Sequence, residues 1–127
     1  MSDTISSSDA AAPVASYSQA VAAGDLVFVS GQIPLDPQSG ELIAHSIEAA
    51  TEQSLRNVQR ILEAAGLELR HVVKASVFLI NTGDYAGMDA TYKNIMPEPF
   101  PAREAVFVMG LPKESRVEIS VIAHTQR

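Results

Sequence analysis

The sequence predicts an α+β fold in which two helices cover one face of a mixed sheet. Two stretches, residues 47–65 and 84–96, carry apolar residues at helical spacing. Several shorter stretches are rich in β-branched and aromatic residues and are bounded by glycine or proline. The helical and extended stretches alternate unevenly along the chain, which favours a two-layer α+β sandwich.

Length and composition place the chain among ordinary globular proteins. It has 127 residues, of which 46% are hydrophobic and 19% charged, enough for one domain with a single core. Residues 1–12 are rich in serine and alanine, so we expect a mostly disordered tail followed by one domain over residues 13–127.

Charge and cysteine content exclude several functions. Fifteen acidic against nine basic residues give a net charge of −6, with the basic residues dispersed, so we expect no nucleic-acid partner. Without cysteine there is no disulfide or thiolate nucleophile, and no apolar run is long enough to cross a membrane. We therefore expect a cytoplasmic protein with no membrane partner.

The first part of the domain should form two strands around the Gly24-Asp25 turn. The second of these, residues 26–32, is apolar on both faces and is expected to be central in the sheet. Ser30 and Gly31 interrupt it near its end, where a glycine commonly marks a bulge or the close approach of a ligand or another backbone. Residues 33–40 then form a turn-rich excursion with two prolines.

The first helix is predicted over residues 47–65, with Ser46 as its N-cap and Gly66 just past its end. A strand follows at 72–80. The second helix, over 84–96, should turn five residues inward: Tyr85, Met88, Tyr92, Ile95 and Met96.

Prolines 97, 99 and 101 rule out a continuing helix and predict an extended arm that carries Arg103 to the start of a strand. Two strands joined by residues 111–115 follow, and we expect them to form a hairpin. The last, 116–124, alternates with period two. The second face of the sheet stays apolar in several strands, which favours a homo-oligomer that covers it.

Two charged residues could carry chemistry. Arg103 is either a structural ion pair or a clamp for a small carboxylate, because its planar fork pairs with two oxygens. Glu118 is either a solvated strand residue or a carboxylate in a cleft, where burial would raise its pKa and suit it to acid–base catalysis. On neighbouring strands of a hairpin, the two could face one cavity or simply pair with each other.

Other candidates carry weaker signals. The three histidines are scattered without the spacing of metal ligands, so no metal site is expected. Ser30 lacks the preceding glycine of a nucleophile elbow. Asp89 lies beside the inward face of the second predicted helix, as a solvated carboxylate or at the rim of a site.

Six motifs in order resemble the RidA (YjgF) family, also known as endoribonuclease L-PSP. The resemblance covers about residues 13–123 and rests on Tyr17-Ser18-Gln19-Ala20, Val29-Ser30-Gly31-Gln32-Ile33-Pro34, the turn at 36–41, Val73-Lys74-Ala75-Ser76-Val77-Phe78-Leu79, Phe100-Pro101-Ala102-Arg103, and Leu111-Pro112-Lys113 with Val117-Glu118-Ile119.

The resemblance implies a chorismate-mutase-like two-layer sandwich with a mixed six-stranded sheet, assembled as a homotrimer with a cleft at each subunit interface. It implies cofactor-free hydrolysis of 2-enamine and 2-imine acids, such as 2-aminoacrylate and 2-iminopropanoate, to 2-keto acids and ammonia. Arg103 would bind the substrate carboxylate and Glu118 would serve the attacking water. Tyr17 and Ser30 would line the cleft, with Tyr17 coming from the neighbouring subunit.

The chain departs from the family pattern at three places. Asp89 stands where the family has an asparagine, and in the cleft it would pair with Arg103 or repel an anionic substrate. Ala15-Ser16 replaces Gly-Pro, and Glu104 follows the arginine. Two other functions therefore remain open: a trimer that only binds small carboxylate metabolites or protein partners, and the ribonuclease of the family's other name, which the net charge disfavours.

Overall fold

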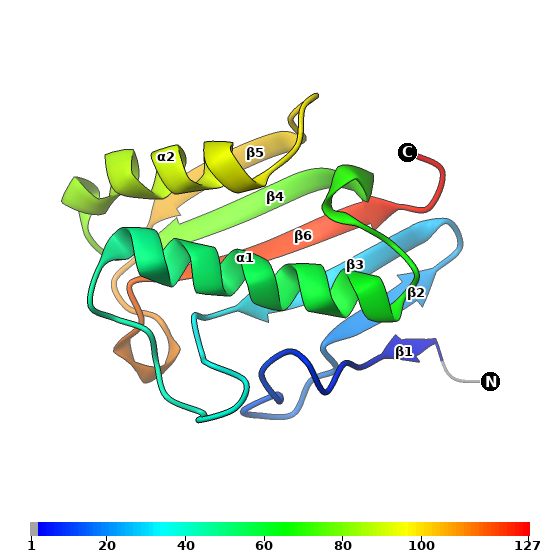
Figure 1. Ribbon diagram of the computed structural model, residues 1–127, viewed down its shortest axis with the longest axis horizontal. Helices are drawn as coiled ribbons and strands as arrows, with labels where there is room; N and C mark the ends of the chain where they lie inside the picture. The colour runs from blue at the N-terminus through cyan, green and yellow to red at the C-terminus, as the bar shows by residue number, and fades with distance from the viewer. Residues whose placement is uncertain (1–2) are drawn as a thin grey trace.

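The computed structural model describes residues 3–127 and has two layers, a twisted sheet and a pair of helices on one of its faces (Figure 1). The sheet has six strands in the order β1-β2-β3-β6-β4-β5. The elements are β1 (Thr4–Ile5), β2 (Ala20–Ala23), β3 (Leu26–Gln32), α1 (Ile47–Ala64), β4 (Val72–Leu79), α2 (Tyr85–Ile95), β5 (Ala102–Phe107) and β6 (Val117–His124). The predicted α+β fold is confirmed.

Both helices lie where the sequence predicts them, with ends that differ by one residue. The Ser46 hydroxyl accepts a hydrogen bond from the Ala49 N–H at 3.0 Å and so caps the start of α1. The chain leaves α1 through Gly66, whose φ of +77° favours glycine. The buried stripe of α1 packs on the sheet: Ile47, Ala50, Thr51, Ser54, Leu55, Asn57, Val58, Ile61 and Leu62.

The disordered tail expected over residues 1–12 is wrong for the part that the structure describes. Thr4 and Ile5 form β1 and pair antiparallel with β2 at one edge of the sheet. Ala10 and Ala11 are buried, and the buried Gln19 side chain accepts from the Ser7 N–H and donates to the Ala11 carbonyl at 2.8 Å. Small side chains and a satisfied amide therefore order a segment whose composition suggests disorder; residues 1–2 lie outside the described residues.

The expected hairpin of the last two strands is also wrong. The last strand, β6, inserts between β3 and β4 and pairs antiparallel with both. Strand β5 runs parallel to β4 at the other edge of the sheet. The physical reason lies in burial: β6 alternates between buried and half-buried residues as a central strand does, whereas much of β5 is exposed.

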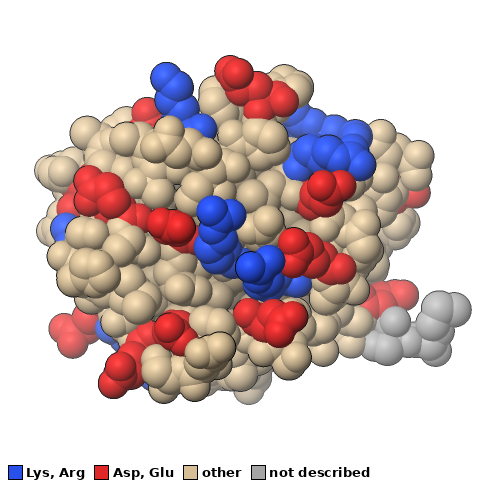
Figure 2. Space-filling view, viewed as in Figure 1, with Lys and Arg blue, Asp and Glu red and all other residues tan. Residues whose placement is uncertain are grey.

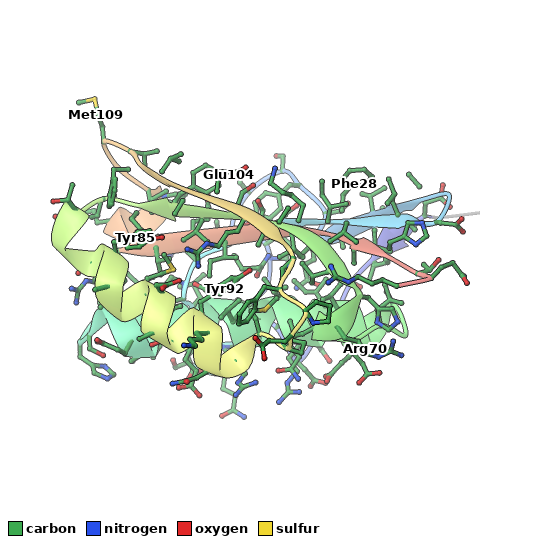
Figure 3. All side chains as sticks on the ribbon, turned by 90° about the horizontal axis from the view of Figure 1, so that it is seen from above. Phe28, Arg70, Tyr85, Tyr92, Glu104 and Met109 are labelled. Carbon is green, nitrogen blue, oxygen red and sulfur yellow. The ribbon has the colours of Figure 1, made fainter. Side chains whose placement is uncertain are left out.

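The sheet has one covered and one open face. On β6, Val117, Ile119, Val121 and Ala123 are buried against the helices. On the face away from the helices, Phe28 and Glu104 project outward (Figure 3), and Val21, Phe28 and Val106 are each about 40% exposed. The oligomer expected to cover this face stays a prediction. Among residues 3–127 no helix is long and apolar enough to cross a membrane.

Candidate active site

The proline arm leads from α2 to β5, as expected, and Arg127 fastens it. The Arg127 guanidinium donates to the Val72 carbonyl at 2.5 Å and to the Pro99 carbonyl at 2.7 Å. One side chain thus ties the start of β4 to the middle of the arm. Strand β5 begins at Ala102, so Arg103 is its second residue and points from a fixed backbone.

Arg103 lies between the sheet and α2 in a well-defined set of contacts. Its Nη1 is 2.8 Å from Asp89 Oδ1, and its Nη2 donates to the Tyr85 hydroxyl at 2.8 Å. The guanidinium carbon lies 4.8 Å from the centre of the Tyr92 ring, within the range of a cation–π contact. The pairing of Asp89 with Arg103, one of the two expectations for this carboxylate, is therefore confirmed.

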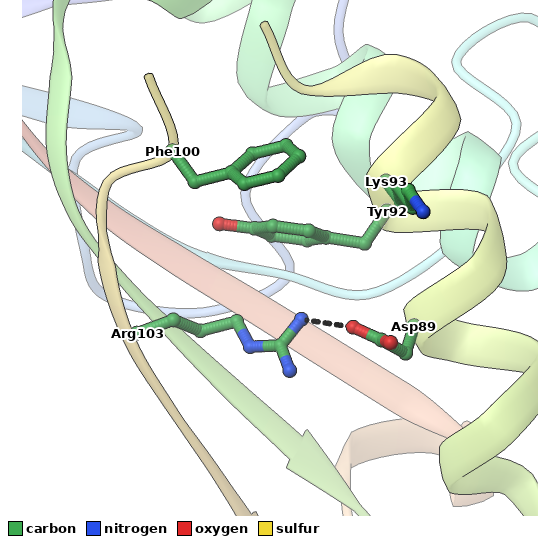
Figure 4. Close-up of a pocket in the computed structure, with 5 residues that line it drawn as sticks. All are labelled: Asp89, Tyr92, Lys93, Phe100 and Arg103. Atoms are coloured by element: carbon green, nitrogen blue, oxygen red, sulfur yellow. Dashed lines mark hydrogen bonds and ion pairs between the residues drawn. The ribbon is translucent and has the colours of Figure 1, made fainter. Parts of the chain in front are cut away.

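Arg103 lies in a cavity of about 330 Å³, which is lined by Asp89, Tyr92, Lys93, Phe100 and Arg103 (Figure 4). The Tyr92 hydroxyl is buried and has no hydrogen-bond partner among residues 3–127. Burial raises the pKa of the Tyr92 hydroxyl, although the nearby Arg103 charge opposes this shift. The cavity thus combines an aromatic wall with both signs of charge.

Glu118 lies in a second cavity, of about 310 Å³. The cavity is lined by Val14, Ala15, Tyr17, Ser30, Gly31, Ile33, Pro112 and Glu118. Burial raises the pKa of the Glu118 carboxyl above its ordinary value of 4.5. Tyr17, Ser30 and Glu118, three of the predicted site residues, therefore do come together. The Ser30 hydroxyl donates to the Ser18 carbonyl at 2.7 Å and so supports the wall of this cavity.

Arg103 and Glu118 do not meet within one chain. In the sheet, Arg103 is level with Ala75 of β4, and Glu118 is level with Phe78 of the same strand. Residues an odd number of positions apart on a strand point to opposite faces, so Arg103 lies on the helix side and Glu118 on the open side. The expectation that they share a cavity or pair within a chain is wrong, because β4 separates them.

The structure also shows contributors that the sequence analysis did not assign to the site. Tyr85, expected in the core, is 40% exposed and orients Arg103 with its hydroxyl. Gly31 lies against Glu118: a Cβ at Gly31 would come within 2.7 Å of Glu118 Cδ. The isolated glycine in a strand was the signal for that close approach. The Glu104 carboxylate accepts a hydrogen bond from the Ser76 hydroxyl and forms an ion pair with Lys74, away from the residues that line the Arg103 cavity.

Comparison of the sequence and the structure with known proteins identifies a family. The family model described as Endoribonuclease L-PSP matches residues 7–125. The chain belongs to this family, known also as RidA or YjgF. The predicted resemblance is confirmed.

Named members of the RidA family align along almost the full chain. The 2-iminobutanoate/2-iminopropanoate deaminase of Salmonella typhimurium is 44% identical over 126 residues, which cover 97% of this chain and 98% of that protein. A RutC family protein of Pyrococcus horikoshii is 42% identical over 126 residues, covering 99% and 100%. The crystal structure of RidA from an Antarctic Psychrobacter is similar with a TM-score of 0.92 at 42% identity, covering 95% of this chain and 98% of that one.

Proposed function

We propose that this protein is a cofactor-free hydrolytic deaminase that converts 2-enamine and 2-imine acids of the 2-aminoacrylate/2-iminopropanoate type to 2-keto acids and ammonia. The observation that carries the proposal is the separation of Arg103 and Glu118 into two cavities on opposite faces of the sheet. Each chain supplies one half of two different sites, and the deaminase name of a relative at 44% identity gives the reaction class.

The open face supports a way for the two halves to come together. In a cyclic homotrimer each interface is heterologous, so one surface of a subunit meets a different surface of the next. Packing through the apolar open face would bring the Glu118 cavity of one subunit to the Arg103 cavity of its neighbour. Tyr17, which is 41% exposed at the Glu118 cavity, would then close the cleft from the adjoining subunit.

Arg103 serves as the clamp for the substrate carboxylate. A guanidinium has five N–H donors, and the contacts with Asp89 and Tyr85 use two of them, so the others remain for two carboxylate oxygens. Orientation of this kind can supply several kcal/mol of the barrier, roughly 7–11 in well-aligned cases. The clamp fixes the C=N carbon of the substrate in the cleft.

Glu118 carries the proton. Its carboxylate takes a proton from water as the water oxygen bonds to the substrate C2, and the C=N double bond becomes a C–N single bond. Glu118 returns that proton to the nitrogen of the resulting carbinolamine. As the C–N bond breaks, the hydroxyl O–H bond gives its proton to Glu118 and the oxygen forms the C=O bond. That proton then leaves with the ammonia, so one protonated imine and one water yield one keto acid and one ammonium ion. The raised pKa of the Glu118 carboxyl suits a group that both accepts and donates a proton.

Two other functions compete with the deaminase for this protein. The ion pair between Arg103 and Asp89 favours a trimer that binds small carboxylates without turnover, because it partly neutralises the clamp. A ribonuclease needs a continuous basic surface. On the face in Figure 2, Lys and Arg are interspersed with Asp and Glu, and Arg56 and Arg60 each pair with a glutamate of α1.

The first experiment is keto acid formation from 2-iminopropanoate that a dehydratase generates in situ. Catalytic amounts of the protein should accelerate it, and Arg103→Ala and Glu118→Ala should each abolish the acceleration. If the folded wild-type protein leaves the rate of keto acid formation at its uncatalysed value, the deaminase is refuted and the binding protein is favoured.

Mixing the two inactive variants tests whether a site is built from two subunits. After random reassembly, an interface is intact when a wild-type Arg103 meets a wild-type Glu118, which holds for roughly one interface in four of any cyclic ring. We therefore expect about a quarter of the wild-type activity. No recovery from a mixture shown to exchange subunits would contradict the shared site.

A further inference from the structure

The Arg103 cavity presents two opposite charges side by side. The Nη1 of Arg103 and the Oδ1 of Asp89 are 2.8 Å apart, with the two side chains 18% and 48% exposed. The second carboxylate oxygen, Asp89 Oδ2, has no partner among residues 3–127 and points away from the guanidinium (Figure 4). A ligand in this cavity therefore meets a donor fork and a free acceptor together.

The neighbouring tyrosines hold this pair in place. The Tyr85 hydroxyl accepts from Nη2 of Arg103, and the Tyr92 ring lies under the guanidinium. Asp89 comes from the middle of α2, so its backbone is fixed by the helix. The pair is thus preorganised, and its orientation does not depend on a ligand.

We propose that Asp89 is a substrate-selecting residue, whose carboxylate accepts a hydrogen bond from the protonated nitrogen of a 2-imino acid while Arg103 binds the carboxylate of the same molecule. In a 2-imino acid a single carbon separates the nitrogen from the carboxylate, which suits two protein charges in direct contact. The inference rests on the proposed deaminase and names which form of the substrate its site selects.

The same carboxylate disfavours the product. A 2-keto acid has a carbonyl oxygen where the imino acid has N–H, and an ionised carboxylate can only accept hydrogen bonds. The keto acid therefore leaves Asp89 Oδ2 without a donor and faces it with lone pairs, which costs binding free energy. Asp89 also favours the iminium over the neutral imine, because a nearby negative charge stabilises the protonated form.

The charges of the cavity lining give the expected direction of a substitution. Arg103 and Lys93 are cationic and Asp89 is anionic, a formal charge of +1 that becomes +2 in Asp89→Asn. The amide still offers an oxygen to Arg103, so the clamp keeps its neighbour. A net anion should then bind more tightly, and a zwitterion should lose its partner for the nitrogen.

The test measures binding rather than turnover, with L-alanine as the stable zwitterion and pyruvate as the keto acid anion. Titration calorimetry gives both dissociation constants for the wild-type protein, Asp89→Asn, Asp89→Glu and Glu52→Gln. We expect Asp89→Asn to shift the ratio of the two constants by roughly tenfold or more toward pyruvate, the size expected for one charge-assisted hydrogen bond. Glu52→Gln, which removes an exposed charge on α1, should leave the ratio unchanged, and Asp89→Glu should retain part of the preference.

The outcomes separate this inference from the proposed function. Turnover of 2-iminopropanoate with an unchanged ratio in Asp89→Asn would overturn the selecting role and leave the deaminase standing. A shifted ratio without turnover would support Asp89 as a selector in a binding protein and refute the deaminase. If the wild-type enzyme is active, we also expect pyruvate to inhibit the Asp89→Asn variant more strongly than it inhibits the wild-type enzyme.

Discussion

Gly31 of β3 packs directly against the carboxylate end of Glu118 on β6. A Cβ at position 31 would lie 2.7 Å from Glu118 Cδ and 2.9 Å from its Cγ, closer than such atoms approach. The Glu118 side chain therefore occupies its position in the cavity only because residue 31 has no side chain. Gly31 acts on the proposed chemistry through Glu118 and is a positioning residue.

Gly31→Ala should clearly reduce kcat/KM while it changes the free energy of unfolding only slightly. The glutamate can move to make room, but a displaced proton carrier lowers kcat/KM, on the order of 10- to 100-fold for a shift near 1 Å. Gly110→Ala is the matched control, because nothing lies within 4 Å of a Cβ built there. Steady-state kinetics of both variants decide the matter; equal kcat/KM values would show that the contact does not position Glu118.

Glu118 should make the protein less stable as the pH rises. Burial raises the pKa of its carboxyl in the folded state above the ordinary value of 4.5, which applies in the unfolded state. At pH values between the unfolded-state and folded-state pKa, the folded state therefore binds more protons than the unfolded state. The free energy of unfolding should therefore fall as the pH increases through this window. Glu118→Gln should gain stability relative to wild type at about pH 7.5 compared with about pH 4. Urea unfolding at both pH values measures this difference, and a pH-independent difference would contradict the assignment.

Arg116 should be needed for stability. Its guanidinium makes two hydrogen bonds, at 2.7 and 3.2 Å, to Asp84, whose side chain is 8% exposed at the start of α2. In Arg116→Ala that carboxylate would remain nearly buried without its cation, which we expect to cost about 2–3 kcal/mol. Arg56→Ala, which breaks an exposed pair with Glu52, should change the free energy of unfolding by less than about 0.5 kcal/mol. Similar losses in both variants would argue against this role.

Arg127 should affect substrate binding from a distance. It joins the Val72 carbonyl to the Pro99 carbonyl, and the arm it fastens carries Phe100 and Arg103. Arg127→Ala should raise KM by roughly 3- to 10-fold, which corresponds to the free energy of about one hydrogen bond. We expect a smaller change in kcat. Gln126→Ala serves as the control. An unchanged KM with a lower melting temperature would assign Arg127 to stability alone.

The helices were predictable because their signals are local. The stripe of α1 and its Ser46 cap lie within one stretch of sequence, and so does the periodicity of α2. Strand β1 was missed because it has two residues and pairs with β2, which lies farther along the chain. Strand order was missed for the same kind of reason: which strand β6 pairs with depends on burial across the whole sheet.

The site residues were easier to name than to arrange. Residue type indicated Arg103 and Glu118, and the resemblance added Tyr17, Ser30 and Asp89. That the two charged residues face opposite ways depends on their register with Ala75 and Phe78, which no motif encodes. Tyr85 was assigned to the core from its helical spacing, but its hydroxyl reaches Arg103 at the edge of the packed layer.

If the proposed site is shared between subunits, the division of Arg103 and Glu118 between two faces would also make activity depend on protein concentration. If a site needs two chains, the number of sites per chain falls whenever dilution separates subunits, whereas a site within one chain would be unaffected. Specific activity would then report the dissociation constant of the assembly, and a cell that makes too little of the protein would lose function faster than it loses protein.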